Sequence, residues 1–150
     1  MADSLSGLSS LGVVLGVGDW TSNDTLASAF TAMGRINSIG GITLDQESID
    51  SSAIGDTVSQ FVPGRSDTGG SWTVTVNVTP ATITEWKTLQ GQTKWFEVYH
   101  PNMTQAWFVA ASVPSKLPLP EIGQNELMTI EISLVIGFYH GFDAAVAPTV

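Results

Sequence analysis

Two segments of this chain alternate apolar and polar side chains with a period of two. Residues 71–79 and residues 127–137 both follow the pattern. Successive side chains of a strand point to opposite faces of a sheet, so each segment predicts a strand with one face in a core and one in water. The predicted core faces are Trp72, Val74, Val76 and Val78, with Met128, Ile130, Ile132, Leu134 and Ile136. The predicted wet faces are Thr73, Thr75 and Asn77, with Thr129, Glu131 and Ser133.

Other segments add predicted strands and one helix. β-Branched and aromatic residues predict a strand over 11–17, a long strand over 30–44 that glycines bend or bulge, and a hairpin over 93–99 and 104–113. Thr79 as N-cap, Pro80 at the first helical position and Gly91 past the end predict a short helix that packs through Ile83 and Trp86. Residues 114–123, which hold three prolines, predict an extended connector.

The segment 45–67 has the weakest periodicity in the chain. A loop of this length without secondary structure is unusual in a compact domain and is normally functional. A solvated loop is one interpretation. We favour a docking loop that orders against a neighbour, because a solvated loop has little use for large apolar residues. Its candidate contact residues are Asp45, Glu47, Ile49, Asp50, Ile54, Val58 and Phe61.

The composition favours one domain that buries much of its own surface against other copies. The 150 residues predict a single domain, 1–150, with 1–10 and 143–150 as flexible or arm-like termini. Hydrophobic residues make up 43% and charged residues 13%, so uncharged polar residues must cover most of the surface. The predicted fold class is mainly β: a β-sandwich or half-barrel with one short helix and a long inter-strand loop.

Charge and cysteine content exclude several kinds of site. Five Lys and Arg face 14 Asp and Glu, and the five cations are scattered, so binding of nucleic acid by phosphate neutralisation is disfavoured. The chain has no cysteine, which excludes disulfides and thiolate metal sites. The N-terminus lacks the basic start of a secretory signal, and the apolar run at 8–17 is too short to span a membrane. We therefore expect synthesis in a cytoplasm and no membrane anchor.

We find no set of residues for catalysis, a cofactor or a metal. His100 and His140 stand apart in sequence, and the acidic residues at 45, 47 and 50 lack the glycine and glutamate of an EF-hand loop. The glycine-rich segment 64–70 lacks the lysine of a phosphate-binding loop. A carbohydrate- or ligand-binding β-sandwich stays open as an alternative, with Trp95, Tyr99 and Trp107 as its platform.

Three segments together resemble a known family. They are residues 40–50, residues 61–75 with their Pro-Gly-x-x-Asp-Thr-Gly turn before an alternating strand, and residues 129–137. In order and spacing, residues 36–138 resemble the major tail tube protein of long-tailed, siphovirus-like bacteriophages. An appended outer immunoglobulin-like domain has no counterpart in this sequence.

The resemblance implies a structural role in a virion, in a protein made in the host bacterial cytoplasm. In that family the subunit is a small β-sandwich or half-barrel, six copies form a ring, and stacked rings form a tube for double-stranded DNA. The loop 45–67 would reach a neighbouring subunit or ring. The implied partners are other copies of the chain, a tape measure protein, a tail terminator and distal tail proteins. Related tubes of contractile tails or type VI secretion machines remain alternatives.

The wet strand faces would line the bore of such a tube. Thr73, Thr75, Asn77, Thr129, Glu131 and Ser133 would form a hydroxyl-rich, slightly acidic wall. A basic wall would hold DNA back through its phosphates, whereas a neutral or acidic wall lets it slide.

Overall fold

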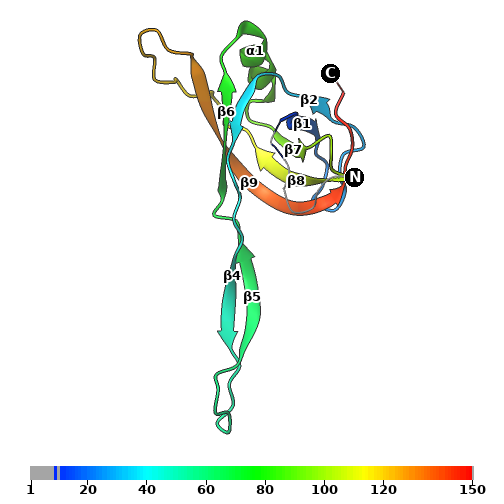
Figure 1. Ribbon diagram of the computed structural model, residues 1–150, viewed down its shortest axis with the longest axis vertical. Helices are drawn as coiled ribbons and strands as arrows, with labels where there is room; N and C mark the ends of the chain where they lie inside the picture. Colours follow the sequence, from blue (N-terminus) through cyan, green and yellow to red (C-terminus); the bar gives the residue numbers. More distant parts are fainter. Residues whose placement is uncertain (1–8, 10, 150) are drawn as a thin grey trace.

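The computed structural model describes residue 9 and residues 11–149 and shows a curled sheet from which a hairpin projects (Figure 1). Seven antiparallel strands form the sheet in the order β2-β1-β7-β8-β9-β6-β3, and β4 and β5 form the separate hairpin. One helix, α1, packs against the body. The elements are β1 Val14–Asp19, β2 Thr31–Ala32, β3 Ile36–Ile39, β4 Asp45–Asp50, β5 Phe61–Asp67, β6 Ser71–Asn77, α1 Pro80–Leu89, β7 Thr93–Tyr99, β8 Gln105–Ser112 and β9 Thr129–Ala144.

The main core lies on one face of the sheet, where the alternation in the sequence predicted it. The burial alternates residue by residue along β6 and the first half of β9, and β7 and β8 add Phe96 and Val109 to the same cluster. Met128 departs from the prediction: it precedes β9 and stays exposed. The buried members from β6 and β9 are Trp72, Val74, Val76, Ile130, Ile132 and Leu134.

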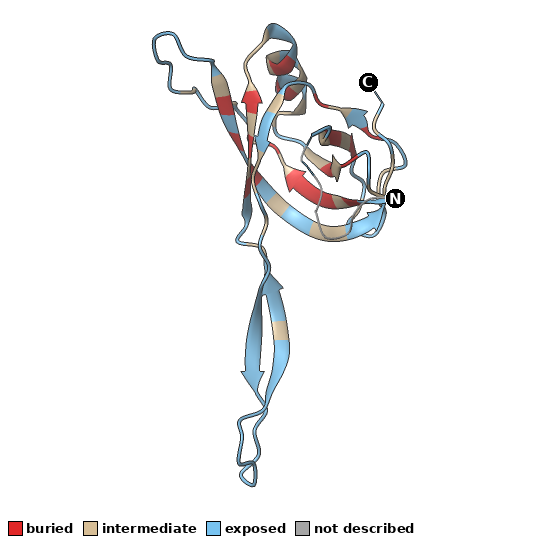
Figure 2. Cartoon of the chain, in the orientation of Figure 1, coloured by how far each residue is buried: buried red, intermediate tan, exposed pale blue. Residues whose placement is uncertain are grey.

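A second, smaller core lies on the opposite face of β7 and β8. Trp95 and Phe96 are adjacent and point to opposite faces, yet both are fully buried. Trp95 joins Phe108 and Phe30 in this second cluster, while Phe96 belongs to the main one. The sheet is therefore buried on both faces around β7 and β8 and on one face only at β6 and β9 (Figure 2).

The helix begins and ends where local signals predicted. Thr79 is the N-cap, and its hydroxyl accepts the backbone N–H of Thr82, whose own hydroxyl accepts the N–H of Thr79 in return. This reciprocal pair is a capping box. Trp86 is fully buried and stacks on Phe96 at 6.2 Å between ring centroids, so the helix anchors to the main core as expected.

The prediction of one long strand over 30–44 is wrong. The segment holds β2 and β3, separated at Arg35, whose φ of 59° is left-handed. A register shift follows between Ile36 and Ser38. Gly40 then approaches Thr73 so closely that an added Cβ would lie 2.7 Å from the Thr73 carbonyl oxygen. The glycine-induced irregularity was expected, but the break itself lies at an arginine.

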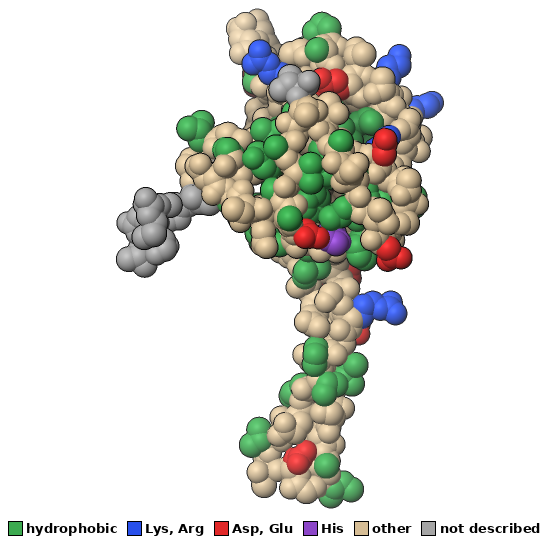
Figure 3. Space-filling view, turned by 90° about the vertical axis from the view of Figure 1, so that its right-hand side faces the viewer, with side chains coloured by type: hydrophobic (Ala, Val, Ile, Leu, Met, Phe, Trp, Pro, Cys, Tyr) green, Lys and Arg blue, Asp and Glu red, His purple; other side chains and the backbone are tan. Residues whose placement is uncertain are grey.

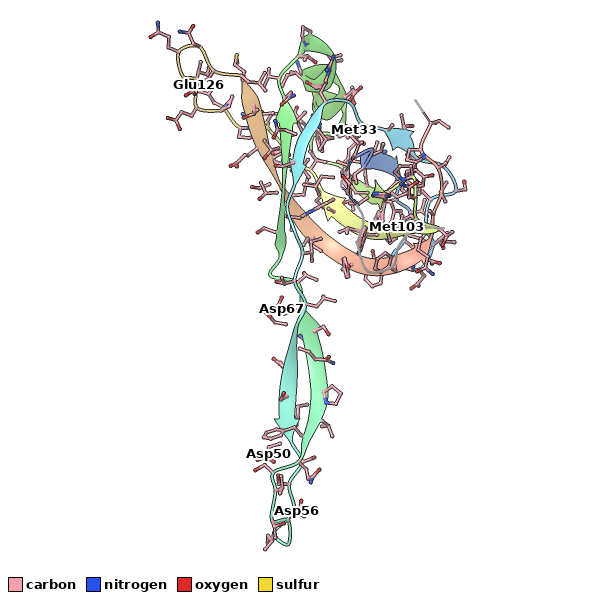
Figure 4. All side chains as sticks on the ribbon, viewed as in Figure 1. Met33, Asp50, Asp56, Asp67, Met103 and Glu126 are labelled. Carbon is pink, nitrogen blue, oxygen red and sulfur yellow. The ribbon has the colours of Figure 1, made fainter. Side chains whose placement is uncertain are left out.

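The prediction that 45–67 lacks secondary structure is also wrong. β4 and β5 pair along most of this segment, from Asp45 opposite Asp67 to Asp50 opposite Phe61. Only the tip, 51–60, is outside the strands. Figure 4 shows the labelled Asp67, Asp50 and Asp56 in turn along the hairpin, away from the body.

The last strand is longer than predicted, and the residues that follow it lie against the body. β9 runs on through Ala144, with register shifts against β8 that let it curl. Residues 145–149 pack along the body instead of extending as an arm. The predicted N-terminal arm, 1–10, lies outside the described residues apart from Ser9, whose carbonyl oxygen lies 2.6 Å from His100 Nε2.

Candidate assembly and channel surfaces

The six residues predicted to line a channel lie together on one face of β6 and β9. The register places Thr73 opposite Ser133, Thr75 opposite Glu131 and Asn77 opposite Thr129. All six are exposed or half-buried, and the apolar partners on the reverse face are buried. We call these three cross-strand pairs the polar face. It is a wet surface backed directly by the main core.

Asn37 extends the polar face onto β3, and the sequence pattern did not predict this. Its side-chain amide donates to Asn77 Oδ1 at 3.0 Å. On the other side of β9, Val135 lies opposite Ser112, whose hydroxyl lies 2.9 Å from that of Thr93. The register between strands determines which of these side chains are neighbours. The residue pattern of a single strand therefore cannot predict these contacts.

Two backbone edges flank the polar face. β3 is the last strand on its side of the sheet. β8 pairs with β9 only from Val135 onward, so within the described residues the first half of β9 has β6 on one side and no strand on the other. The N–H of Ile136 donates to the Gly70 carbonyl, and the N–H of Val78 donates to the Met128 carbonyl. In an antiparallel pair every second residue bonds the partner strand, so the even-numbered residues of this half of β9 face β6. The backbone groups of Glu131 and Ser133 therefore face the open edge.

The hairpin is an exposed projection with apolar side chains. Every residue of β4 is exposed, and the space-filling view shows hydrophobic side chains along the stalk and at its tip (Figure 3). Ile54 is fully exposed, and Ile49, Val58 and Phe61 each keep at least half of their surface in water. Concentrations of exposed apolar residues of this kind are typical of surfaces that contact another molecule.

Hydrogen bonds within the tip hold its conformation. Asp50 Oδ1 accepts the backbone N–H of Ser52 at 2.9 Å, and this bond is the main cause of a lowered pKa for Asp50. Ser52 Oγ accepts the N–H of Gln60 at 2.7 Å, and Asp56 Oδ2 accepts the N–H of Ala53 at 2.7 Å. Asp50 therefore orders the tip, whereas Asp45 and Glu47 lie exposed on β4.

The pairing at the base of the hairpin is electrostatically unfavourable. Asp45 lies directly opposite Asp67, and like charges in this arrangement destabilise a sheet. Arg65 is the one cation that the sequence places in 45–67, against five acidic residues. The hairpin is thus both acidic and apolar, and its backbone ladder and the hydrogen bonds of its tip stabilise it.

The connector 113–128 forms a second projection near the opposite end of the long axis, where Figure 4 labels Glu126. It leaves the body after Val113, whose N–H bonds the Gln92 carbonyl. Its tip is exposed and includes the large side chains of Leu119, Ile122 and Leu127. The prediction of an extended connector agrees with this irregular segment.

The aromatic platform considered as an alternative does not exist. Trp95 is fully buried, and its indole N–H donates to the Thr25 carbonyl at 3.0 Å. Tyr99 shares a face of β7 with Trp95, whereas Trp107 on β8 pairs with Val98 and lies on the other face, where it packs on Phe142. The three rings cannot stack against one ligand.

The histidines have structural partners. His100 is buried in its turn and its Nδ1 accepts the backbone N–H of Asn102, so its other nitrogen donates to Ser9. His140 Nε2 lies 2.8 Å from Asp143 Oδ2, and this hydrogen bond is the main cause of a lowered pKa for Asp143. Across residues 11–149 and Ser9, no three His, Asp or Glu side chains gather as metal ligands. The same residues include no helix long and apolar enough to cross a membrane.

Comparison with known proteins identifies the fold. No protein-family model matches the chain, and no curated protein matches it. The structure is similar to a chain in the tail of an empty gene transfer agent particle, computed with helical refinement and C6 symmetry. The TM-score is 0.59 at 9% sequence identity, over 93% of this chain and 100% of that chain.

A second likeness is to a chain of the anti-feeding prophage baseplate, determined by cryo-electron microscopy with sixfold symmetrisation. Here the TM-score is 0.50 at 14% identity, over 91% of this chain and 95% of that one. At such identities the likeness shows a shared fold. The predicted fold class, a mainly β half-barrel with one short helix, is confirmed.

Proposed function

We propose that this chain is the self-assembling subunit of a bacteriophage tail tube, in which rings of copies stack into a conduit for double-stranded DNA. The observation that carries the proposal is the polar face: a wet, hydroxyl-rich surface that lies between two open backbone edges and directly above a core. A single chain leaves both edges incomplete, and lateral pairing between copies removes them.

The edges are suited to a ring because they are different from each other. A contact between the outer edge of β3 in one copy and the open half of β9 in the next is heterologous, and a heterologous contact closes into a ring when its rotation allows. Six copies is the number that we propose, since both similar assemblies have sixfold symmetry. The polar faces then meet around one bore.

The composition of this bore suits the passage of DNA. Glu131 is the one charged residue among the six of the polar face, and the remaining five carry hydroxyl or amide groups. Phosphates bind walls rich in Lys and Arg, and a wall of this kind offers them no such partner. The subunit therefore guides DNA without binding it specifically.

The hairpin supplies the contact between neighbours. It projects well beyond the body, and Ile49, Ile54 and Phe61 expose apolar surface that a neighbouring subunit or ring would cover. The acidic residues Asp45 and Glu47 lie in the same interface. We extend the proposal to a virion tail as the location and to tape measure, terminator and distal tail proteins as further partners.

An assembly experiment tests this function. The purified chain is concentrated and examined by negative-stain microscopy, beside a variant with Ile49→Ser, Ile54→Ser and Phe61→Ser. We expect hollow filaments from the natural chain and folded, unpolymerised subunits from the variant. A matched control with Thr57→Ala and Ser59→Ala changes polar residues of the same tip and should polymerise normally. A natural chain that stays monomeric at every concentration and salt would overturn the proposal.

The inner tube of a contractile tail or of a type VI secretion machine is the second candidate. The likeness to a baseplate chain of the anti-feeding prophage favours it. Fold and assembly would be the same, and the distinction is whether the tubes bind a sheath protein. Co-sedimentation of the filaments with a sheath subunit encoded beside the gene separates the two.

A further inference from the structure

The C-terminal residues close one edge of the sheet within a single chain. β2 is the last strand on the side away from β3. Thr149 N–H donates to the Phe30 carbonyl at 3.0 Å, and Ala32 N–H donates to the Thr149 carbonyl at 2.7 Å. Together they form a parallel bridge at Thr31. The groups that Thr149 satisfies are outward-facing backbone groups of β2 and of Phe30 just before it, and without Thr149 this edge would be open.

A buried carboxyl holds this C-terminal segment, 145–149, which we call the strap. Glu97 is fully buried, and its Oε2 accepts the backbone N–H of Val146 at 2.9 Å. Its Oε1 has no partner among the described residues. Gly16 lies beside the carboxyl, and a Cβ added there would approach Phe30 and the strap residue Pro148 to 3.1 and 3.2 Å. A buried carboxyl is costly without hydrogen bonds, so its bond to the strap is the reason it is tolerated.

The strap also covers the second core. Ala145 and Val146 pack on the cluster that holds Phe30, Trp95 and Phe108. The side chains of the strap are small, and its hydrogen bonds go to Thr104, Glu97, Phe30 and β2. It follows the last strand, so its release would leave the pairings between the named strands in place.

We infer that the strap is an autoinhibitory cap. When the strap is closed, it bonds the outward backbone groups of β2 and covers the second core. A free chain then does not pair with other chains along β2. Open, the strap exposes an unpaired edge beside apolar side chains, the combination that templates strand pairing between molecules. Self-association is thereby confined to the edges that flank the polar face and to the hairpin. This inference goes beyond the proposed tube function and concerns the free chain.

The test perturbs the Glu97 carboxyl and the strap separately. Glu97→Leu removes the acceptor for Val146 at similar volume, and Glu97→Gln keeps an acceptor and is the matched control. A chain that ends at Ala144 lacks the strap. Near-ultraviolet circular dichroism confirms that each variant is folded. Hydrogen exchange at the Ala32 amide then reports opening of the edge, and sedimentation velocity reports association.

We expect Glu97→Leu to accelerate exchange at Ala32 by about tenfold or more, because local opening governs amide protection. The shortened chain should associate at concentrations where the natural chain and Glu97→Gln do not. Adding Ala32→Pro to the shortened chain removes the outward N–H of β2 and should restore the natural behaviour. A folded, shortened chain that associates no more than the natural one would overturn the inference. Filament formation is scored separately by microscopy, so failure of the tube proposal is distinguishable from failure of the cap.

Discussion

Reversing the one charge on the polar face tests whether this face meets DNA. Glu131 is exposed, has Thr75 opposite it, and forms none of the ion pairs found among the described residues. Surface substitutions of this kind usually change the free energy of unfolding by less than about 0.5 kcal/mol. Glu131→Lys should therefore leave the fold intact and change only the charge of the wall.

The size of the effect follows from the geometry of β6. Its seven residues span roughly 23 Å along the strand direction. Duplex DNA carries about one charge per 1.7 Å, or ~14 phosphates over that length. Six copies with lysine in place of glutamate would change the wall by about 12 charges per ring and place about six cations against those phosphates. That is enough to neutralise close to half of them.

The assay is DNA release from particles assembled with the variant subunit, followed with a DNA-binding dye. We expect slow or stalled release that recovers as salt rises from about 50 to 200 mM, because phosphate contacts are salt-dependent. Glu131→Gln, which removes charge without adding a cation, should release DNA normally. Identical release by Glu131→Lys and the natural chain at low salt would refute a luminal position for this face.

Two further predictions concern stability. Trp86→Ala should lower the free energy of unfolding by about 3–5 kcal/mol, because it empties a fully buried site against Phe96. Trp86→Phe should cost clearly less, because it keeps a ring and removes a buried indole N–H that has no partner among the described residues. Equal losses in urea denaturation would contradict this difference. Burial raises the pKa of Glu97, so the folded chain binds this proton more tightly than the unfolded chain. This tighter proton binding stabilises the folded chain at pH values below the ordinary glutamate pKa. The stabilisation is lost as the pH rises through the raised pKa of Glu97. Glu97→Gln should abolish that loss. Urea denaturation from acidic to neutral pH measures the free energy of unfolding of both proteins. If the variant shows the same pH dependence as the natural chain, the loss does not come from Glu97.

Patterns within one element were sufficient to predict several features. The alternation along 71–79 identified both faces of β6, because side-chain direction in a strand depends only on residue parity. The start of α1 followed from Thr79 and Pro80, since capping is a local interaction. The hairpin of β7 and β8 followed from its turn in the same way.

The polar face shows how far such patterns reach. The sequence predicted its six residues strand by strand, and their use as a channel wall stays a prediction. The direct pairs, such as Thr75 with Glu131, and the addition of Asn37 depend on register between strands far apart in the chain. That register is a property of the folded sheet.

Tertiary structure alone decided the rest. The segment 45–67 shows no alternation because neither face of its hairpin is buried in the chain, so the signal that reveals β6 has no cause there. The strap and the buried Glu97 likewise leave no local pattern, because their contacts join residues 49 positions apart. Hydrophobic periodicity in one element reflects the burial of one of its faces against the core. It does not reveal a surface that is covered by another chain or by a distant segment of the same chain.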